Sequence, residues 1–138
     1  MNGPNVLIID GQGGAMGAAL IRAILARFPD LSITAVGTNA AATSAMLKAG
    51  ASEAATGENP ALVACRRADV ILGPVGIVIA DAMLGEVTPD MACAVGQAKA
   101  RRILIPMNRC ETLIAGARSQ GTTALLSDAV DCLAELLG

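Results

Sequence analysis

The stretch Val6-Leu7-Ile8-Ile9-Asp10-Gly11-Gln12-Gly13-Gly14-Ala15-Met16-Gly17 decides the fold of this chain. An apolar run stops at Asp10, four glycines follow within seven residues, and apolar residues at helical spacing come next. A strand, a glycine turn and a helix in this order are typical of the start of a Rossmann-type sheet. The free backbone N–H groups at such a helix start favour an anion, so the stretch also predicts where a ligand binds.

Each glycine of the turn has an expected role. Gly11 permits a sharp exit from the strand through a positive φ, and Gly17 lets the helix press against the strand. Gly13 and Gly14 leave space for another backbone or a phosphate to approach, and if the turn binds a phosphate, the N–H of Gly14 is expected to face it. Met16 stands where the strict pattern has its third glycine, so the fit is to a looser dinucleotide motif. The alternative is a turn that binds nothing and only joins strand to helix.

The composition indicates one domain, residues 1–138, that associates with copies of itself. Apolar residues make up 54% of the chain and charged residues only 16%, which suggests surface buried in a homodimer or higher homo-oligomer. The net charge is −2, the basic residues are scattered and Phe28 is the one aromatic residue. A nucleic-acid partner is therefore not expected.

The cysteines and the apolar runs indicate the cellular location of the protein and whether it binds a metal. The four cysteines lie far apart in sequence and histidine is absent, so no metal site is expected and the thiols are expected to be reduced. The longest apolar run, residues 70–84, is interrupted by Pro74 and Asp81 and is too short to span a membrane. Without a signal-peptide pattern, these features predict a cytoplasmic protein.

Apolar periodicity predicts an α/β chain. Alternating strands and helices indicate a three-layer Rossmann-like fold with a mainly parallel sheet of five or six strands. The segment 77–84 is apolar all round except at Asp81, which predicts a helix buried in the domain or at an interface. Strands are expected at 5–10, 31–36, 51–55, 69–72, 102–105 and 112–115. Helices are expected at 14–28, 39–49, 59–67 (with Asn59 as N-cap), 77–84, 88–98 and 125–137. A second glycine turn is expected at 73–76.

Ligands of such sheets bind beyond the carboxyl ends of the strands, where the strand order reverses. The loops that converge there supply the candidate cofactor-binding residues: Gly11, Gln12, Gly13, Gly14, Ala15, Met16, Thr38, Asn39, Gly73, Pro74, Asn108 and Arg109. A small phosphate-containing ligand is expected, with NAD or NADP as the cofactor if there is one.

The second strand lacks the acid that usually binds the ribose of NAD. Counting about twenty residues from the glycine motif leads to Thr38 and Asn39, neither of which is acidic. No arginine for the 2′-phosphate of NADP stands there either. Asn39 has two interpretations: a hydrogen bond to a ribose, or the cap of the helix that follows.

Four further residues have competing interpretations. Asp10 either meets a ligand through a metal or fixes the turn through backbone N–H groups, and the second is favoured. Asp81 is either a buried acid with a raised pKa or a residue that faces a partner or water. Arg109 can pair with a carboxylate or phosphate. Cys110 is a candidate nucleophile, but the chain has no histidine base, so a small buried residue is the default.

Several strings along nearly the whole chain are specific when taken together: IDGQGG at 9–14, GTN at 37–39, ATSAMLKAGA at 42–51, ATGEN at 55–59, GPVG at 73–76, MLGE at 83–86 with TP at 88–89, and PMNRC at 106–110. Through them the chain resembles a bacterial family of small Rossmann-like proteins classed as a domain of unknown function. The resemblance implies the fold and no established activity.

Two classes of function therefore remain open. The first is an enzyme or enzyme-like domain that binds a nucleotide cofactor of the NAD(P) type. The second is a non-catalytic sensor or assembly subunit whose glycine turn is structural or binds a small phosphate-containing regulator. The missing base and the missing acid favour the second class, whereas the glycine and polar residues at the strand ends favour the first.

Overall fold

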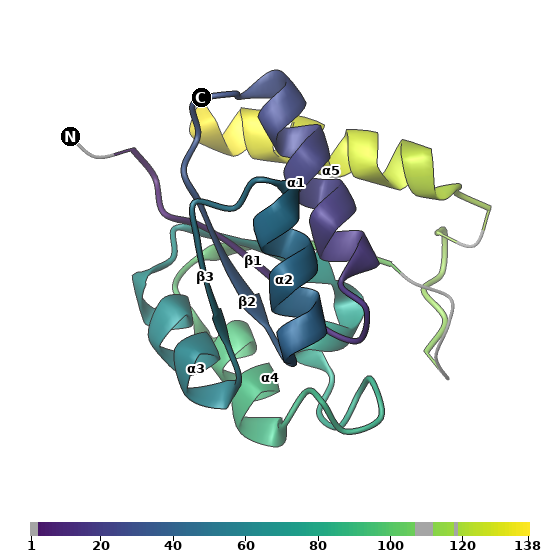
Figure 1. Ribbon diagram of the computed structural model, residues 1–138. Helices are drawn as coiled ribbons and strands as arrows, with labels where there is room; N and C mark the ends of the chain where they lie inside the picture. The colour runs from purple at the N-terminus through teal and green to yellow at the C-terminus, as the bar shows by residue number, and fades with distance from the viewer. Residues whose placement is uncertain (1–2, 107–111, 118) are drawn as a thin grey trace.

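The computed structural model describes residues 3–106, 112–117 and 119–138. They form a sheet of five parallel strands in the order β3-β2-β1-β4-β5, with helices on both faces (Figure 1). The strands are β1 (Val6–Asp10), β2 (Ile33–Gly37), β3 (Glu53–Thr56), β4 (Val70–Pro74) and β5 (Arg101–Ile105). The helices are α1 (Ala15–Arg27), α2 (Ala40–Ala49), α3 (Glu58–Arg67), α4 (Pro89–Gln97) and α5 (Thr122–Leu137), with a 3-10 helix η1 (Val75–Val78).

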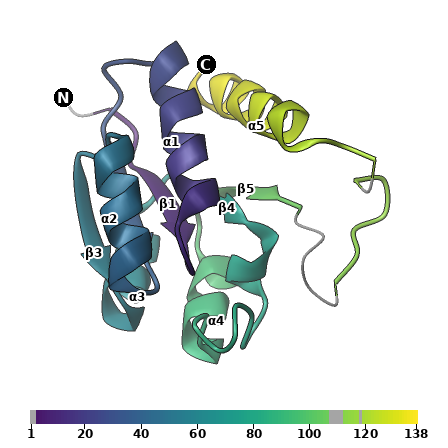
Figure 2. The same cartoon turned by 45° about the vertical axis from the view of Figure 1, so that its right-hand side comes forward.

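The sheet lies between two layers of helices (Figure 2). An apolar core fills the space between the sheet and the helices on each face. Helices α1, α2 and α5 cover one face, where Ile8 and Leu72 from the strands meet Leu20 and Leu133 from the helices. Helices α3 and α4 cover the other face around residues such as Ile71. The central strands β1 and β4 are buried at every position, as expected for parallel strands covered on both sides. The expected three-layer α/β fold is confirmed.

The strand register places the functional loops at one edge. Asp10, the last residue of β1, pairs with Gly37, the last residue of β2, and the N–H of Thr38 donates to the carbonyl of Asp10 at 3.0 Å. The chain leaves β1 toward β2 on one side and leaves β4 toward β5 on the other. The order of the strands thus reverses between β1 and β4, which is where such sheets bind ligands.

The helices expected at 39–49 and 88–98 are confirmed, and each begins with a side-chain cap. The side chain of Asn39 accepts the N–H of Ala42 at the start of α2, and that of Thr88 accepts the N–H of Met91 at the start of α4. The prediction for Asn59 is wrong, because α3 begins at Glu58 with Gly57 as its N-cap and no side-chain cap. The carboxylate of Glu58 in the first turn complements the helix dipole there.

The predicted helix at 77–84 is wrong. Gly73 and Pro74 belong to β4, η1 follows directly, and residues 79–87 form a series of turns rather than a helix. Asp81, Met83 and Leu84 have φ of 67°, 59° and 57°, values that end a right-handed helix. Leu84 is 98% exposed, so the segment is not a buried helix. Of its apolar residues, Ile77 belongs to the core on the α3 and α4 face, and Val78 and Ala82 pack against that core.

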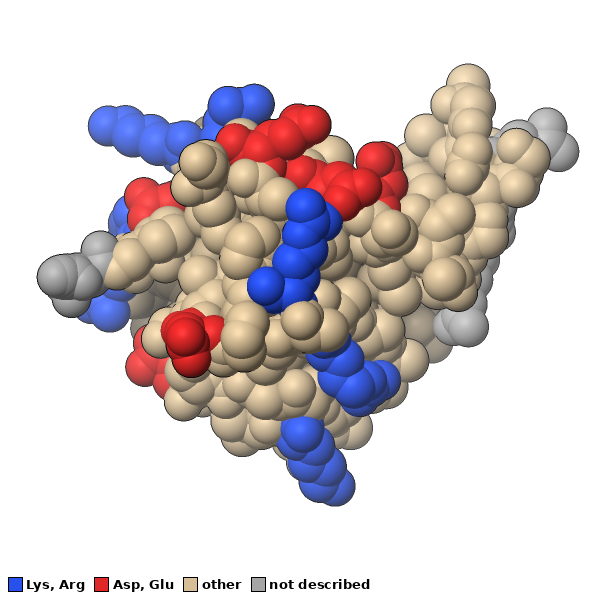
Figure 3. All heavy atoms as spheres, turned by 90° about the horizontal axis from the view of Figure 1, so that it is seen from above, with Lys and Arg blue, Asp and Glu red and all other residues tan. Residues whose placement is uncertain are grey.

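The expected strand at 112–115 is also wrong. Residues 112–114 have no regular structure and residues 115–117 form a turn, so the sheet has five strands among the described residues. The segment projects from the body of the domain before α5 begins (Figures 1 and 2). Within the described ranges, no helix combines the length and the apolarity needed to cross a bilayer. Lysine and arginine side chains are spread over the face seen in Figure 3 rather than gathered in one patch.

Candidate functional site

A cleft of about 610 Å³ lies at the carboxyl ends of β1 and β4, where the strand order reverses. One wall is the glycine turn, residues 10–16, with Ala19 of α1. The opposite wall comes from the end of β4 and from the turns at 79–87. Its residues are mostly apolar: Pro74, Val75, Gly76, Ile79, Met83 and Leu84. The hydroxyl-bearing residues Thr112 and Thr122 complete the lining.

Gly14 is fixed by backbone geometry rather than by space for a ligand. It is the N-cap of α1 with φ 77°, and its N–H donates to the carbonyl of Gly11 at 2.9 Å. The expectation that this N–H faces an anion is therefore wrong. A β-carbon on Gly14 would lie 2.8 Å from Cα of Ala42 in α2. The absence of a side chain allows α1 and α2 to approach each other.

Gly11 and Gly13 differ in the structure: Gly11 is tightly packed, whereas Gly13 faces open space. Gly11 does not have a positive φ, contrary to the prediction, and the left-handed residue is its neighbour Gln12 with φ 50°. Gly11 lacks a side chain for a steric reason, because a β-carbon there would lie 2.6 Å from Sδ of Met83. Around Gly13, by contrast, a β-carbon would meet nothing within 4 Å. Gly13 is exposed and lines the cleft, so open space lies in front of it.

Gly17 has the packing role predicted for it. A β-carbon on Gly17 would lie 2.9 Å from Cβ of Asp10 and 2.6 Å from Sδ of Met46 in α2. The first contact sets the distance between α1 and β1, and the second sets the distance between α1 and α2. Both distances are shorter than a packed β-carbon tolerates, so a larger residue must displace one of the three elements.

The carboxylate of Asp10 fixes the turn, as favoured from the sequence. Its Oδ1 accepts the N–H of Gly11 at 2.8 Å and its Oδ2 accepts the N–H of Gly17 at 2.6 Å. The residue is only 4% exposed. Burial raises the pKa of Asp10, and this effect outweighs the opposing hydrogen bonds from the backbone of Gly17 and Gly11. A carboxyl group of the protein itself thus accepts two of the backbone N–H groups at the start of α1.

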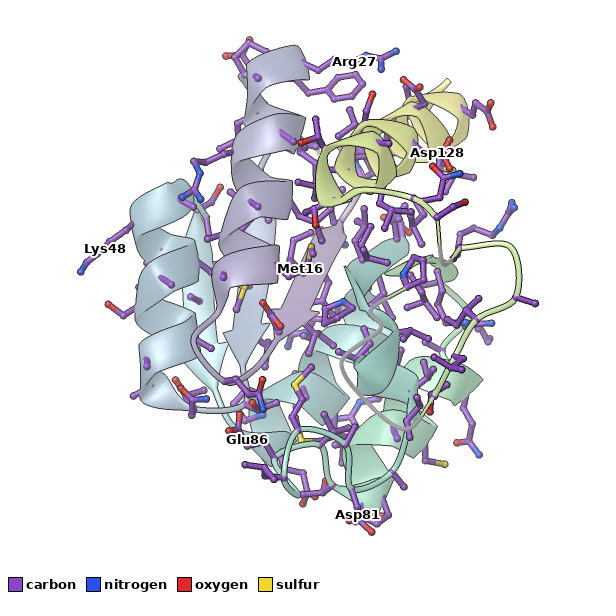
Figure 4. The ribbon with its side chains drawn as sticks, turned by 90° about the vertical axis from the view of Figure 1, so that its right-hand side faces the viewer. Met16, Arg27, Lys48, Asp81, Glu86 and Asp128 are labelled. Atoms are coloured by element: carbon purple, nitrogen blue, oxygen red, sulfur yellow. The ribbon has the colours of Figure 1, made fainter. Side chains whose placement is uncertain are left out.

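A second carboxylate, that of Glu86, reaches the glycine turn from the loop before α4. Its Oε1 accepts the N–H of Gln12 at 2.8 Å, the hydroxyl of Thr38 at 2.6 Å and the amide Nδ2 of Asn39 at 2.8 Å. These hydrogen bonds, that of Thr38 first, lower the pKa of Glu86. Figure 4 shows Glu86 near the start of α1, on the inner side of the loop.

Glu86 explains the position of Thr38 and Asn39. Asn39 caps α2 through its Oδ1 and also donates from Nδ2 to Glu86 and to the carbonyl of Gln12, at 2.8 Å each. Of its two interpretations, the cap is confirmed. Neither Thr38 nor Asn39 lines the cleft, and neither does Glu86, which accepts hydrogen bonds from both of them.

Two backbone donors of the turn remain available for a ligand. The N–H of Gln12 donates to Glu86 and that of Gly14 donates to the carbonyl of Gly11. The N–H groups of Gly11, Gly17 and Met16 are directed to the carboxylate of Asp10. Within the described part of the chain, the N–H groups of Gly13 and Ala15 donate no hydrogen bond, and both residues are exposed in the cleft. Two such donors at a helix start can bind one anionic group. The charged residue among the described lining of the cleft is Asp10, so no cation assists them there.

The structure brings together most, but not all, of the predicted site residues. Those in the cleft are Gly11, Gln12, Gly13, Gly14, Ala15, Met16 and Pro74. Gly73 is packed instead, since a β-carbon there would press on the backbone carbonyl of Ile9. Asn108, Arg109 and Cys110 lie outside the described residues. Asp81 is exposed at the outer edge of the molecule (Figure 4), so its interpretation as a buried acid is wrong.

Glu86 and the apolar wall of residues 75–84 were missed from the sequence. One signal was present: the MLGE string at 83–86 is the acidic and apolar part of a loop that follows a strand end. It was hidden because the uniformly apolar run was interpreted as a helix. Of the cysteines, Cys65, Cys93 and Cys132 are free thiols. No cluster of three metal-ligating side chains exists among the residues that the structure describes.

Comparison with known proteins gives a family and two structures. The family model described as a domain of unknown function (DUF3842) matches residues 5–138. No curated protein matches the chain. A dodecameric FMN-dependent UbiX-like decarboxylase from Escherichia coli O157:H7 has 14% identity and a TM-score of 0.51, over 96% of this chain and 94% of that one, and so shares the fold.

The second structure is an imine reductase variant from Myxococcus stipitatus in complex with NAD+. It has 31% identity and a TM-score of 0.41. The match covers 65% of this chain and only 29% of the reductase, so this chain spans less than a third of the length of that protein.

Proposed function

This chain belongs to the DUF3842 family, whose model describes a domain of unknown function, and we propose that it binds a nucleotide of the NAD(P) type in the cleft at the ends of β1 and β4. One observation carries the proposal. Gly13 and Ala15, whose N–H groups donate to no described residue, line a cleft at the topological switch point of a parallel sheet.

The two walls of the cleft suit the two parts of a nucleotide. A phosphate group fits in front of Gly13, where a β-carbon would meet nothing, and accepts the N–H groups of Gly13 and Ala15. The apolar wall that includes Val75, Ile79 and Met83 offers a surface for a flat ring. Ligand pockets commonly combine such an apolar lining with a few placed polar groups.

A second candidate is supported by the two internal carboxylates. Asp10 and Glu86 already occupy the N–H groups of Gly17 and Gln12, which reduces the number of donors for a phosphate. This favours a non-catalytic sensor or assembly subunit that binds a small phosphate-containing regulator or uses its turn only structurally. The chain has no histidine, and no base stands in the described part of the cleft apart from the buried Asp10.

A thermal-shift screen with NAD, NADP, AMP and sugar phosphates separates the two candidates, because a ligand of the native state raises the melting temperature. The test variant is Gly13→Leu, which fills the open space before the two donors. Gly96→Leu is the matched control, since Gly96 is an exposed glycine of α4 whose β-carbon also meets nothing. The proposal expects NAD or NADP to stabilise the native chain and the control, but not Gly13→Leu.

Two results would contradict the nucleotide proposal. Stabilisation by a sugar phosphate alone would favour a small regulator. The absence of any shift would leave the turn as a structural element.

We also propose that the protein works in the cytoplasm as a homodimer or larger homo-oligomer. Leu84 is 98% exposed and Leu113 is 63% exposed, so apolar side chains stand uncovered on the described surface. Sedimentation at micromolar concentration tests the proposal, and a stable monomer would contradict it.

A further inference from the structure

The carboxylate of Glu86 lies beside the end of β2, where the sequence itself has no acid. Nucleotide-binding sheets of this type hold an acid at the end of β2, where it accepts hydrogen bonds from ribose hydroxyls. At that point this chain has Thr38 and Asn39, which both donate to the carboxylate of Glu86. An acid is therefore present beside the end of β2, but the loop between β4 and α4 supplies it.

The carboxylate is also tied to the glycine turn. The N–H of Gln12 donates to Oε1 of Glu86 at 2.8 Å, and the next residue, Gly13, carries one of the two unpartnered donors in the cleft. The acid thus lies one residue along the turn from the proposed phosphate site. A ribose joins a phosphate directly in a nucleotide, so this proximity matches the connectivity of the ligand.

One oxygen of Glu86 is left for a ligand. All three hydrogen bonds end on Oε1, whereas Oε2 accepts none from the described residues, and the side chain is partly exposed. Three donors on one oxygen hold the group ionised and in place. Such a group accepts hydrogen bonds from the hydroxyls of a ribose and repels an additional phosphate on it.

We propose that Glu86 is the specificity-determining residue of the site, and that it selects nucleotides with free 2′- and 3′-hydroxyl groups over nucleotides with a 2′-phosphate. The ligand class is accordingly NAD or a related unphosphorylated ribonucleotide rather than NADP. Glu86 itself does not line the cleft; it lies beside it, against Gln12 and Thr38 at the end of β2. The inference rests on the proposed function, because it requires a ribose that continues from the phosphate in the cleft across Gln12 to Glu86.

The test is a calorimetric titration of NAD and of NADP into the native chain, Glu86→Gln and Glu53→Gln. Glu86→Gln keeps the shape and one acceptor but removes the charge. Glu53→Gln is the matched control, because Glu53 also accepts a threonine hydroxyl, that of Thr34 at 3.0 Å, but at the opposite end of its strand from the site. The native chain and the control are expected to prefer NAD by about tenfold or more, and Glu86→Gln is expected to lose most of that preference.

The outcomes separate the two proposals. Equal binding of NAD and NADP to the native chain, or an unchanged preference in Glu86→Gln, overturns the role of Glu86 and leaves the nucleotide site standing. Failure of both nucleotides to bind the native chain overturns both.

A second measurement, made on the native chain, covers the case in which Glu86→Gln does not fold. NAD whose adenosine ribose lacks the 2′-hydroxyl is expected to bind about tenfold more weakly than NAD, because it offers the carboxylate of Glu86 one hydroxyl fewer. A purely structural role for Glu86 predicts equal affinities for the two compounds, and that result would overturn the inference.

Discussion

The carboxylate of Asp10 holds the start of α1, because its Oδ2 accepts the backbone N–H of Gly17 at 2.6 Å. The other oxygen accepts the N–H of Gly11 at 2.8 Å, so one side chain fastens both ends of the glycine turn. The protein therefore supplies its own anion to the first turn of the helix. A ligand must use the donors of Gly13 and Ala15 instead.

Replacing Asp10 tests this relationship. Asp10→Asn presents an amide N–H₂ to one of two buried N–H donors, so we expect the free energy of unfolding at neutral pH to fall by about 1–3 kcal/mol. The measurement is urea denaturation. Asp69→Asn is the control, because Asp69 also accepts a backbone N–H, that of Asn5 at 2.7 Å, but is exposed. An equal loss in both variants would contradict the role given to burial.

The effect of Glu86 on stability is expected to depend on pH. Its pKa in the folded state is lowered from 4.5, chiefly by the hydrogen bond from Thr38. Its contribution to the free energy of unfolding is therefore present above 4.5 and is lost as the pH falls through the lowered value. Denaturation of the native chain and Glu86→Gln across acid and neutral pH measures this difference.

We expect the native chain to be the more stable of the two at neutral pH and the difference to shrink on acidification below 4.5. A difference that grows in acid would contradict the hydrogen bonds assigned to Glu86. Asp10 acts in the opposite direction: burial raises its pKa from 3.8, so its contribution falls as the pH rises through the raised value.

The glycines of the turn are expected to differ in their tolerance of alanine. The new methyl group of Gly13→Ala meets nothing within 4 Å, whereas that of Gly17→Ala meets Asp10 and Met46. In Gly14→Ala the methyl group meets the backbone of Ala42, and Gly14 itself has a φ of 77°, which alanine rarely adopts. We expect the free energy of unfolding to change little in Gly13→Ala, to fall by about 1–3 kcal/mol in Gly17→Ala, and to fall further in Gly14→Ala. Thermal denaturation gives the order.

Gly96→Ala, in an exposed part of α4, is the reference for this series and is expected to stabilise the protein by about 1 kcal/mol. If Gly14→Ala were as stable as Gly13→Ala, the close approach of α1 and α2 would not be what requires a glycine.

Much of this architecture could be predicted from the sequence because local patterns determined it. The apolar run before Asp10 and the caps Asn39 and Thr88 each act over a few residues. The position of Glu86 beside the glycine turn could not be predicted, because Glu86 and Gln12 are 74 positions apart in the chain and no local sequence rule connects them. The segment 77–84 does not form the helix that its apolarity predicts, because its apolar side chains are divided between a core, which contains Ile77, and the cleft, which Ile79 and Leu84 line. The positive φ values of Asp81, Met83 and Leu84 cannot be read from a hydropathy pattern.

Leu84 offers a test of the apolar wall. It has φ 57° and is 98% exposed, so neither its backbone nor its surroundings favour a leucine in the isolated domain. Leu84→Asn fits the left-handed region better, and we expect it to raise the melting temperature of the ligand-free protein while weakening the binding of NAD. Thermal denaturation and calorimetry measure the two effects. A variant that is less stable and binds NAD normally would contradict a function for Leu84 in the cleft.

The central claim is that a nucleotide phosphate is bound by the N–H groups of Gly13 and Ala15. The most direct measurement is a titration of the ¹⁵N-labelled protein with NAD, followed through its backbone amide resonances. The account predicts that the resonances of Gly13 and Ala15 shift most strongly and that the resonance of Gly96, in the exposed part of α4, stays in place. Saturating NAD that leaves the amides of Gly13 and Ala15 unmoved, or that shifts only residues away from the cleft, would contradict it.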